Sequence, residues 1–294
     1  MHFPTRSLSR VAAGLAIGLS LFTTAAHADT RFSDLERTVA KVEQQLGARV
    51  GLSVVNTDSG ITWFHRKNER FLMNSTFKVP LCGAVLARVD KGELSLTDTL
   101  PVAQSDLVPH APITERRVGG TMSLAELCRA AIDMSDNTAA NLLIDYLGRP
   151  DEVTRFFESI GDSVSRLDAR EPELNAFVPG DPENTTSPAA ATQTLHALLI
   201  GDALSPESRD VLRGWMSDGG VTGDLLRDYV PAGWQVFDKS GAGSHTRNLV
   251  ALVVPQDGTS WIVTIFVSDV DAPFKTRNDA LRQIGKAVVS AIGQ

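Results

Sequence analysis

The chain has 294 residues, a formal net charge of −7 and a pI near 5.4. An acidic chain without a basic cluster suits neither nucleic acid nor an anionic membrane surface, so we expect no nucleic-acid partner. The length allows one large core or two closely joined subdomains.

The first residues carry the pattern of a secretory signal peptide. Arg6 and Arg10 precede an almost wholly apolar stretch at 11–22, and A-H-A at 26–28 supplies a small-x-small cleavage site. The stretch is too short to span a bilayer, which disfavours the alternative of a membrane anchor. We therefore predict that residues 1–28 are removed and that the protein is secreted, into the periplasm, without membrane attachment. Nothing suggests an interface, so we expect a monomer.

The predicted strands lie near the two ends of the mature chain, each group next to a terminal helix. S-D-L-E at 33–36 has the form of a capping box, and helical spacing follows to residue 46. Two strands are then predicted at 50–56 and 61–65, with a turn between them. Near the C-terminus the predicted elements are three strands and a final helix, at 234–238, 248–254, 260–267 and 278–292.

The middle of the chain is mostly helical. Its predicted helices are 78–89, 124–134, 138–147, 153–160 and 189–199. A polar, proline-bearing loop at 166–188 interrupts them, and long loops of this kind are usually functional.

These patterns predict an α+β fold, a three-layer α/β sandwich. Five strands from the two ends form one antiparallel sheet, flanked by the N- and C-terminal helices. The sheet subdomain comprises 29–70 and 217–294, and an all-helical subdomain at 71–216 is inserted into it. A ligand cleft is expected between the two.

Ser75 and Lys78 form an S-x-x-K motif. If Ser75 begins a helix, Lys78 lies one turn later on the same face. The Ser75 N–H would then point into the cleft, where a developing oxyanion is stabilised. A capping serine before a lysine is ordinary surface chemistry, so the motif alone is weak. Pro80 cannot donate a backbone hydrogen bond, and we expect a local distortion there.

Ser135, Asp136 and Asn137 lie between two helical runs. A hydroxyl and an amide at such a junction could protonate a leaving group and bind an amide substrate. The alternative is an N-cap, because all three residue types cap helices well.

Lys239, Ser240 and Gly241 lie on a predicted strand after Trp234. The lysine and the hydroxyl could receive a substrate carboxylate, while the glycine lets another backbone approach. A charged residue on an exposed edge strand is the alternative.

With all three motifs in this order, the chain resembles the class A serine β-lactamases. The resemblance covers nearly the whole mature chain and includes S-T-F-K-V at 75–79 and M-S-D-N-T-A-A-N at 134–141. A fourth motif, E-P-E-L-N at 171–175, looks like the family's Ω-loop signature. The resemblance implies that Glu171 and Asn175 hold a hydrolytic water. Penicillin-binding proteins share the first three motifs but lack this loop.

The resemblance implies hydrolysis of penicillins and cephalosporins, and hence antibiotic resistance. Ser75 would attack the lactam carbonyl to give an acyl-enzyme, with inhibitors binding the same site. Its proton would pass to Lys78 directly or to Glu171 through water, and both routes remain open. Ser135 would relay a proton to the departing nitrogen, and Glu171 would drive deacylation.

Further roles are implied for the remaining motif residues. The N–H groups of Ser75 and Ala242 would form the oxyanion hole, and Asn137 would hold the substrate's side-chain amide. Lys239, Ser240 and Arg247 would bind its carboxylate.

The chain has two cysteines, Cys82 and Cys128. An even count in an exported protein suggests one disulfide, with two buried thiols as the alternative. Many members of the resembled family have a disulfide at these positions, and it would clamp the Ser75 helix to the helix before Ser135. The histidines form no H-x-H or H-E-x-x-H pattern, so no metal or other cofactor is expected.

The chain departs from the family at the neck of the Ω-loop. The usual arginine–aspartate pair is replaced by Ala169 and Asn184. The loop is therefore expected to be looser or differently folded, and we hypothesise that the cleft admits bulky oxyimino cephalosporins. Asn74 and Gly243 occupy the places where carbapenem-hydrolysing relatives often have cysteines, so carbapenemase activity is not favoured.

Two cleft assignments stay open. His110 stands where an aromatic residue usually lines the cleft, and it is either a cleft residue or an ordinary loop residue. The segment 244–247 is one residue shorter than usual, which leaves the role of Arg247 open. A D,D-peptidase or a β-lactam sensor would use the same serine, but Glu171 and Asn175 would then have no function. A purely structural protein would need none of the four motifs.

Overall fold

The computed structural model describes residues 1–2 and 31–294. The predicted signal peptide, apart from its first two residues, and its cleavage site lie outside this part. Within it, no helix is long and apolar enough to cross a membrane.

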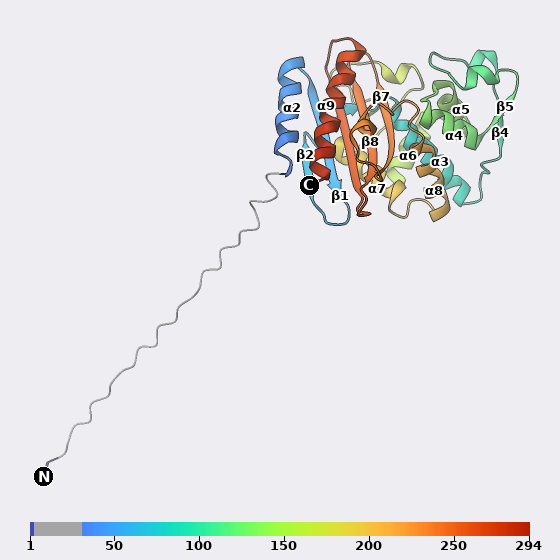
Figure 1. Ribbon diagram of the computed structural model, residues 1–294. Helices are drawn as coiled ribbons and strands as arrows, with labels where there is room; N and C mark the ends of the chain where they lie inside the picture. Colours follow the sequence, from blue (N-terminus) through green and yellow to red (C-terminus); the bar gives the residue numbers. More distant parts are fainter. Residues whose placement is uncertain (3–30) are drawn as a thin grey trace.

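A five-stranded antiparallel sheet forms one side of the molecule (Figure 1). Its strands are β1 (Arg49–Asn56), β2 (Thr62–His65), β7 (Gln235–Ala242), β8 (Arg247–Val254) and β9 (Trp261–Ser268). Their spatial order is β2-β1-β9-β8-β7, so the two ends of the chain meet where β1 pairs with β9. The predicted sheet is confirmed.

Helices cover both faces of this sheet. The terminal helices α2 (Ser33–Leu46) and α9 (Phe274–Ile292) pack on one face, and α7 (Pro188–Leu199) packs on the other. Successive residues of a strand point to opposite faces. In β8, Leu249 and Ala251 therefore join the core under the terminal helices, while Val250 and Leu252 join the helical core. This arrangement confirms the predicted α+β sandwich.

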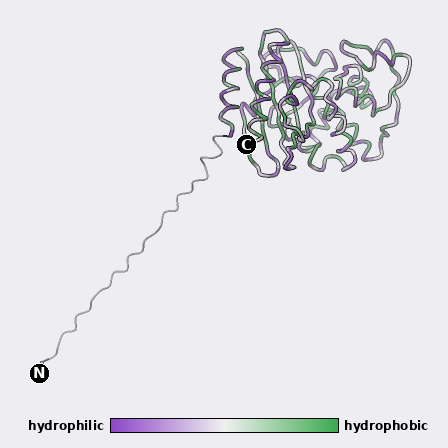
Figure 2. The backbone as a smooth tube through the Cα atoms, viewed as in Figure 1, coloured by the Kyte–Doolittle hydropathy of each residue, from purple (hydrophilic) through white to green (hydrophobic). Residues whose placement is uncertain are grey.

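The N-terminal helix α2 is amphipathic, and its tube alternates between hydrophilic and hydrophobic colours in Figure 2. It buries Leu35, Val39 and Val42. Its first residue is Ser33 and its N-cap is Phe32, where no side-chain capping bond forms. The predicted capping box is therefore wrong, because the serine stands one position inside the helix.

The helical part lies beside the sheet. Its remaining helices are α3 (Lys78–Asp90), α4 (Leu124–Asp133), α5 (Asn137–Leu147), α6 (Pro150–Ser159) and α8 (Pro206–Ser217). The whole segment 78–86 of α3 is buried, as expected of a helix that is packed on every side. The predicted runs omitted α8, although Ser205 and Pro206 give it a regular N-cap and first residue.

Short elements complete the structure. Two small sheets pair β3 (Phe71–Leu72) with β6 (Thr185–Thr186) and β4 (Thr99–Pro101) with β5 (Thr121–Ser123). The 3₁₀ turns are η1 (Asn74–Phe77), η2 (Gln104–Asp106), η3 (Thr114–Arg117), η4 (Glu173–Asn175) and η5 (Leu226–Tyr229). The sequence patterns did not predict these elements.

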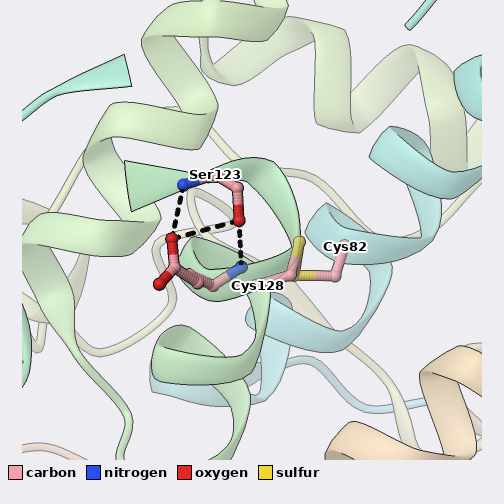
Figure 3. The surroundings of a disulfide bond; sticks show 4 residues. Cys82, Ser123 and Cys128 are labelled. Atoms are coloured by element: carbon pink, nitrogen blue, oxygen red, sulfur yellow. Dashed lines mark hydrogen bonds between the residues drawn. A yellow bond between two sulfur atoms is a disulfide. The ribbon is translucent and has the colours of Figure 1, made fainter. Parts of the chain in front are cut away.

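A disulfide joins α3 to α4, as predicted. Cys82 and Cys128 are both fully buried and their Cα atoms are 5.7 Å apart (Figure 3). At the start of α4, the Ser123 hydroxyl accepts from the N–H of Glu126, whose carboxylate accepts from the N–H of Ser123. A reciprocal capping box thus fixes the beginning of α4, and the disulfide ties its middle to α3.

Candidate active site

Ser75 lies in η1, directly before α3. The N–H of Lys78 donates to the carbonyl groups of Ser75 and Thr76, so a 3₁₀ turn leads into the α-helix. Since α3 begins at Lys78, Pro80 stands in its first turn, where backbone N–H groups have no acceptor within the helix. The α-helix continues through Pro80, and the irregular part of this segment is the 3₁₀ turn at 74–77 that precedes it. Ser75 is half-buried while its neighbours are buried.

The Ser135–Asn137 segment joins α4 to α5, and its middle residue is structural. Asp136 caps α5 by accepting from the N–H of Ala139 at 2.9 Å. Its other carboxylate oxygen accepts from the backbone and hydroxyl of Thr114 at 2.9 and 3.1 Å. The capping alternative therefore applies to Asp136, whereas Ser135 and Asn137 line the cleft.

Lys78 is fully buried and surrounded by acceptors. Its ammonium group donates to the Ser135 carbonyl at 2.8 Å and to Asn137 Oδ1 at 2.6 Å, and it lies 3.3 Å from Glu171 Oε1. Burial lowers the pKa of Lys78, and the nearby carboxylate of Glu171 opposes this shift. The lysine thus joins the segment before α5 to the Ω-loop.

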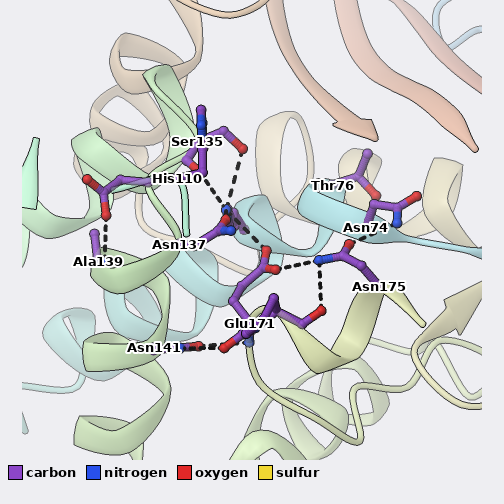
Figure 4. A network of polar contacts seen from close by, with 12 residues as sticks. Asn74, Thr76, His110, Ser135, Asn137, Ala139, Asn141, Glu171 and Asn175 are labelled. Carbon is purple, nitrogen blue, oxygen red and sulfur yellow. Dashed lines mark hydrogen bonds and ion pairs between the residues drawn. The ribbon is translucent and has the colours of Figure 1, made fainter. Parts of the chain in front are cut away.

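Glu171 is held from two sides in the Ω-loop (Figure 4). Its Oε2 accepts from Asn175 Nδ2 at 2.6 Å. The side chain of Asn141 on α5 bonds both to its N–H, at 2.9 Å, and to its carbonyl, at 2.8 Å. Oε1 is buried and has no hydrogen-bond partner among the described residues. Asn175 therefore fixes one carboxylate oxygen, while the other has only the ion-pair contact with Lys78 at 3.3 Å and can still accept a hydrogen bond.

Lys239 lies on the edge strand β7 but is fully buried, which removes the exposed edge-strand alternative. Its ammonium group donates to Ser135 Oγ at 3.0 Å and to the Ser240 carbonyl at 2.8 Å. Burial lowers its pKa well below the usual value, and the charges of Lys78 and Arg247 add to this shift. Two buried lysines therefore converge on Ser135, because Lys78 Nζ lies 3.4 Å from the same hydroxyl.

Gly241 lets β7 approach the backbone beside the nucleophile. A Cβ atom at this position would lie 2.8 Å from the Met73 carbonyl oxygen and 3.2 Å from the Ser75 nitrogen. Real side chains essentially never approach so closely, so only glycine fits here without a shift of the backbone. The next residue, Ala242, lines the cleft.

Arg247 begins β8 and forms part of the cleft wall. Its Nε donates to Asn278 Oδ1 at 2.9 Å and its Nη1 donates to the Gly241 carbonyl at 3.2 Å. Burial lowers its pKa to about 10, so the guanidinium stays protonated at neutral pH.

His110 also lines the cleft. Its ring nitrogen Nε2 lies 3.0 Å from the Met134 carbonyl, and its own carbonyl accepts from the N–H of Asn137 at 2.9 Å. The φ angles of His110, Ser135 and Asn74 are +66°, +56° and +46°. Such left-handed conformations are costly for residues other than glycine and tend to cluster at functional sites.

Asn74 is a central residue of the site that sequence reasoning missed. Its side chain donates to Asn175 Oδ1 at 2.9 Å and accepts from Thr246 Oγ1 at 2.7 Å and from Asn248 Nδ2 at 3.0 Å. It therefore connects the Ω-loop to β8 behind the nucleophile. Its position next to Ser75 was the only signal in the sequence.

The neck of the Ω-loop is closed by neutral and local contacts. Asn184 Oδ1 accepts from the N–H groups of Asp168 and Ala169 at 2.9 and 3.0 Å. Asp168 in turn accepts from the Asn184 N–H at 2.8 Å and pairs with Arg166. An asparagine and a short-range ion pair thus take the place of the arginine–aspartate pair that is usual in the family.

The cleft has a volume of about 310 Å³ and is lined by Ser75, His110, Ser135, Asn137, Asn175, Val221, Ser240, Ala242, Arg247 and Phe274. Behind this lining lie Lys78, Glu171, Lys239 and Gly241, all buried. The structure therefore brings together every residue that the sequence motifs singled out, and it adds Val221 and Phe274. Among residues 1–2 and 31–294, no group of His, Cys, Asp or Glu side chains could hold a metal ion.

Known proteins are similar to this chain both in sequence and in fold. The sequence model of the β-lactamase enzyme family matches residues 34–292. A β-lactamase of Rhodobacter capsulatus is 60% identical over 292 residues, which is 99% of each chain. A solved β-lactamase from Xanthomonas campestris pv. campestris is 42% identical, with a TM-score of 0.86 over 90% of this chain and 99% of its own. An ancestral (GNCA) class A β-lactamase is 45% identical, with a TM-score of 0.84 over 87% and 99%.

The fold and these matches define a β-lactam hydrolase, and the chain belongs to the β-lactamase enzyme family. Within it the chain is a class A serine β-lactamase, and its substrates are small β-lactam molecules.

Proposed function

We propose that the enzyme hydrolyses penicillins and cephalosporins through an acyl-enzyme on Ser75. The Ser75 oxygen bonds to the lactam carbonyl carbon, the carbon–nitrogen bond breaks, and the Ser75 proton passes to Lys78 or, through water, to Glu171. The backbone N–H groups of Ser75 and Ala242 stabilise the developing oxyanion. The approach of β7 to the Ser75 nitrogen at Gly241 supports this assignment.

Ser135 relays a proton to the departing lactam nitrogen: it donates its own hydrogen and takes another from Lys78, whose Nζ lies 3.4 Å from its hydroxyl. A hydroxyl has two acceptor lone pairs and one donor hydrogen. Both lone pairs are engaged when Lys239 and Lys78 donate, at 3.0 and 3.4 Å. The O–H is then left to point away from both lysines, and Ser135 lines the cleft. This arrangement suits a donor to the nitrogen that leaves.

The substrate is oriented by groups on either side of Ser75. Ser240, Arg247 and Lys239 bind its carboxylate, since Arg247 stays protonated and Ser240 lines the cleft. Asn137 holds the side-chain amide. Its Nδ2 donates one hydrogen to the Pro109 carbonyl at 2.9 Å, which leaves the second for the substrate.

The observation that carries the proposal is the carboxylate of Glu171. Its Oε2 is held at 2.6 Å by Asn175, and its buried Oε1 accepts no hydrogen bond within the described residues, although Lys78 Nζ lies 3.3 Å away. A carboxylate held in this way suits a base that holds a water for deacylation. A penicillin-binding protein or a sensor has no use for such a group.

Mass spectrometry with benzylpenicillin tests this role, alongside an assay of lactam loss. We expect the wild type to turn over and Glu171→Ala to hold one penicilloyl adduct on Ser75. Glu171→Gln, which keeps the shape and removes the base, should behave in the same way. Turnover at the wild-type rate in both variants would remove Glu171 from the mechanism.

We also propose that oxyimino cephalosporins are substrates and that carbapenems are poor ones. The neutral Asn184 contacts at the loop neck, in place of an arginine–aspartate pair, support the first part. The double variant Ala169→Arg/Asn184→Asp, which introduces that pair, should lower kcat/KM for an oxyimino cephalosporin more than for benzylpenicillin. A wild-type kcat/KM for the oxyimino compound many orders below that for benzylpenicillin would contradict the proposal.

Finally, we propose that residues 1–28 direct export to the periplasm and that the mature enzyme is a monomer. The support for export is the order of a basic segment, an apolar segment and A-H-A at 26–28 in the sequence. N-terminal sequencing of the exported protein should begin at residue 29, and light scattering should give the mass of one chain. Retention of residues 1–28, or a mass of two chains, would contradict these assignments.

A further inference from the structure

The cleft has an aromatic wall that none of the motifs includes. Phe274 is the first residue of α9 and lines the cleft together with Ser240 and Arg247. Its side chain is 52% exposed. A single exposed phenylalanine is common on protein surfaces, so its place at the substrate cleft is the informative feature.

Phe274 and Arg247 form one surface. The guanidinium carbon of Arg247 lies 5.2 Å from the centre of the Phe274 ring, within the range of a cation–π contact. The bonds of Arg247 to Asn278 and to the Gly241 carbonyl hold the guanidinium in place. Its Nη2 makes no hydrogen bond within the described residues, and it is the nitrogen left for a substrate carboxylate. An aromatic face therefore adjoins the group that we assign to that carboxylate.

His110 belongs to another part of the cleft. Its carbonyl accepts from the N–H of Asn137, the residue assigned to the substrate's side-chain amide. An imidazole therefore stands near the amide side, and a phenyl ring stands near the carboxylate side. The two ends of the cleft differ in the substituents that they can stack against.

We propose that Phe274 is a specificity-determining residue that favours β-lactams carrying a planar aromatic substituent beside the carboxylate. In a cephalosporin, the ring carbon that bears the carboxylate is bonded directly to C3, so a carboxylate at Arg247 brings the C3 substituent toward Phe274. The inference rests on the proposed carboxylate site and deepens it. Offset or edge-to-face stacking then adds to binding without involving the reacting atoms.

The test compares two cephalosporins with the same thienylacetyl side chain. Nitrocefin carries a dinitrostyryl group at C3, whereas cephalothin carries an acetoxymethyl group. Phe274→Ala should raise KM for nitrocefin about 2- to 12-fold, the factor that corresponds to ~0.5–1.5 kcal/mol for one aromatic pair. The KM for cephalothin should change less than twofold, and kcat should change little for either compound.

Matched variants separate stacking from packing. Phe274→Tyr keeps a ring and should keep the wild-type ratio of the two KM values, whereas Phe274→Leu keeps bulk and should lose it. Phe64, on β2, is exposed but does not line the cleft, so Phe64→Ala should leave both KM values unchanged.

Failure of the Phe274 inference can be told apart from failure of the proposed carboxylate site. An equal rise in both KM values in Phe274→Ala would mean that the ring only holds Arg247 in place, and it would overturn the inference. Arg247→Ala should raise KM for both compounds. If it changes neither, the carboxylate site itself is wrong, whatever the Phe274 variants do.

Discussion

Replacing Asn74 by alanine should weaken deacylation and the fold together. The asparagine is fully buried, does not face the cleft, and connects Asn175 of the Ω-loop to Thr246 and Asn248 at the start of β8. Because Asn175 holds Glu171, the loss of this connection reaches the catalytic carboxylate through one intermediate. Asn74 is thus a positioning residue.

The size of the effect follows from the groups left without partners. Thr246 Oγ1 and Asn175 Oδ1 lose their hydrogen bonds to Asn74, whereas Asn248 keeps carbonyl acceptors at Leu72 and Met73. Each unpaired group costs ~1–3 kcal/mol, with Asn175 toward the low end because it is half-buried. An alanine at φ +46° adds ~1–2 kcal/mol of backbone strain. The total is ~3–6 kcal/mol, or ~6–24 °C in Tm.

Thermal unfolding and benzylpenicillin turnover test this reasoning. The loss of one positioning hydrogen bond of ~1.4 kcal/mol should lower the deacylation rate about tenfold, and acyl-enzyme should accumulate. Asn74→Gly tolerates the left-handed backbone, so it should regain ~2–8 °C of Tm while keeping the kinetic defect. If Asn74→Gly deacylates like the wild type, the link through Asn175 is refuted.

Three further changes test other parts of the structure. Removing the disulfide with Cys82→Ala/Cys128→Ala should cost ~4 kcal/mol for its 46-residue separation, with kcat nearly unchanged; an unaltered Tm would contradict this. Gly241→Ala should lower kcat/KM ~10²-fold, because its Cβ forces the strand away from Ser75; wild-type kinetics would show that the backbone absorbs the methyl group. Burial raises the pKa of Asp168, but hydrogen bonds from Arg166 and from the Asn184 N–H outweigh this effect and lower it. The ionised carboxylate therefore stabilises the fold fully above about pH 4, and this stabilisation is lost as the pH falls further. The stability deficit of Asp168→Asn should therefore shrink below about pH 4 in thermal unfolding, and a constant deficit would refute the assignment.

The long elements were predictable because their patterns are local. The strands predicted at 248–254 and 260–267 lie within one residue of β8 and β9, since both are apolar runs bounded by turns. The last helix begins four residues earlier than predicted, at Phe274. Its first residues, 274–276, are not buried, so they show no apolar periodicity that would mark the start.

The capping motif shows where local patterns fail. S-x-x-E occurs at 33–36 and again at 123–126. Only Ser123 is an N-cap, with its backbone extended at ψ 160°, whereas Ser33 is already helical. Both segments have the same motif, so the conformation of the backbone before it decides which segment forms a capping box. The two-residue strands β3 and β6 were missed for a related reason, because their pairing joins segments more than 100 residues apart.

The site residues likewise fall into those that short sequence motifs identify and those that only the folded chain reveals. Ser75, Lys78, Ser135 and Lys239 stand in short motifs and were identified from the sequence. Asn74 acts through partners that lie 101 and 172 positions away, and side-chain amides that bridge distant segments leave no periodic signal. A pattern of neighbours in sequence cannot report such contacts, which only the folded chain creates.

The surroundings of Lys78 bear on its protonation before the substrate arrives. An ammonium group has three donor hydrogens and no acceptor. Three acceptors take its hydrogen bonds: the Ser135 carbonyl, Ser135 Oγ and Asn137 Oδ1. Glu171 Oε1 lies 3.3 Å away as its ion-pair partner. A neutral amine would donate to two of them and turn its lone pair toward the third, so the resting site matches the charged form. Burial lowers the pKa of Lys78 and so disfavours that charge, and the carboxylate of Glu171 opposes this shift. A charged Lys78 can accept the Ser75 proton only after giving up one of its own, and the carboxylate that lies 3.3 Å from it is Glu171.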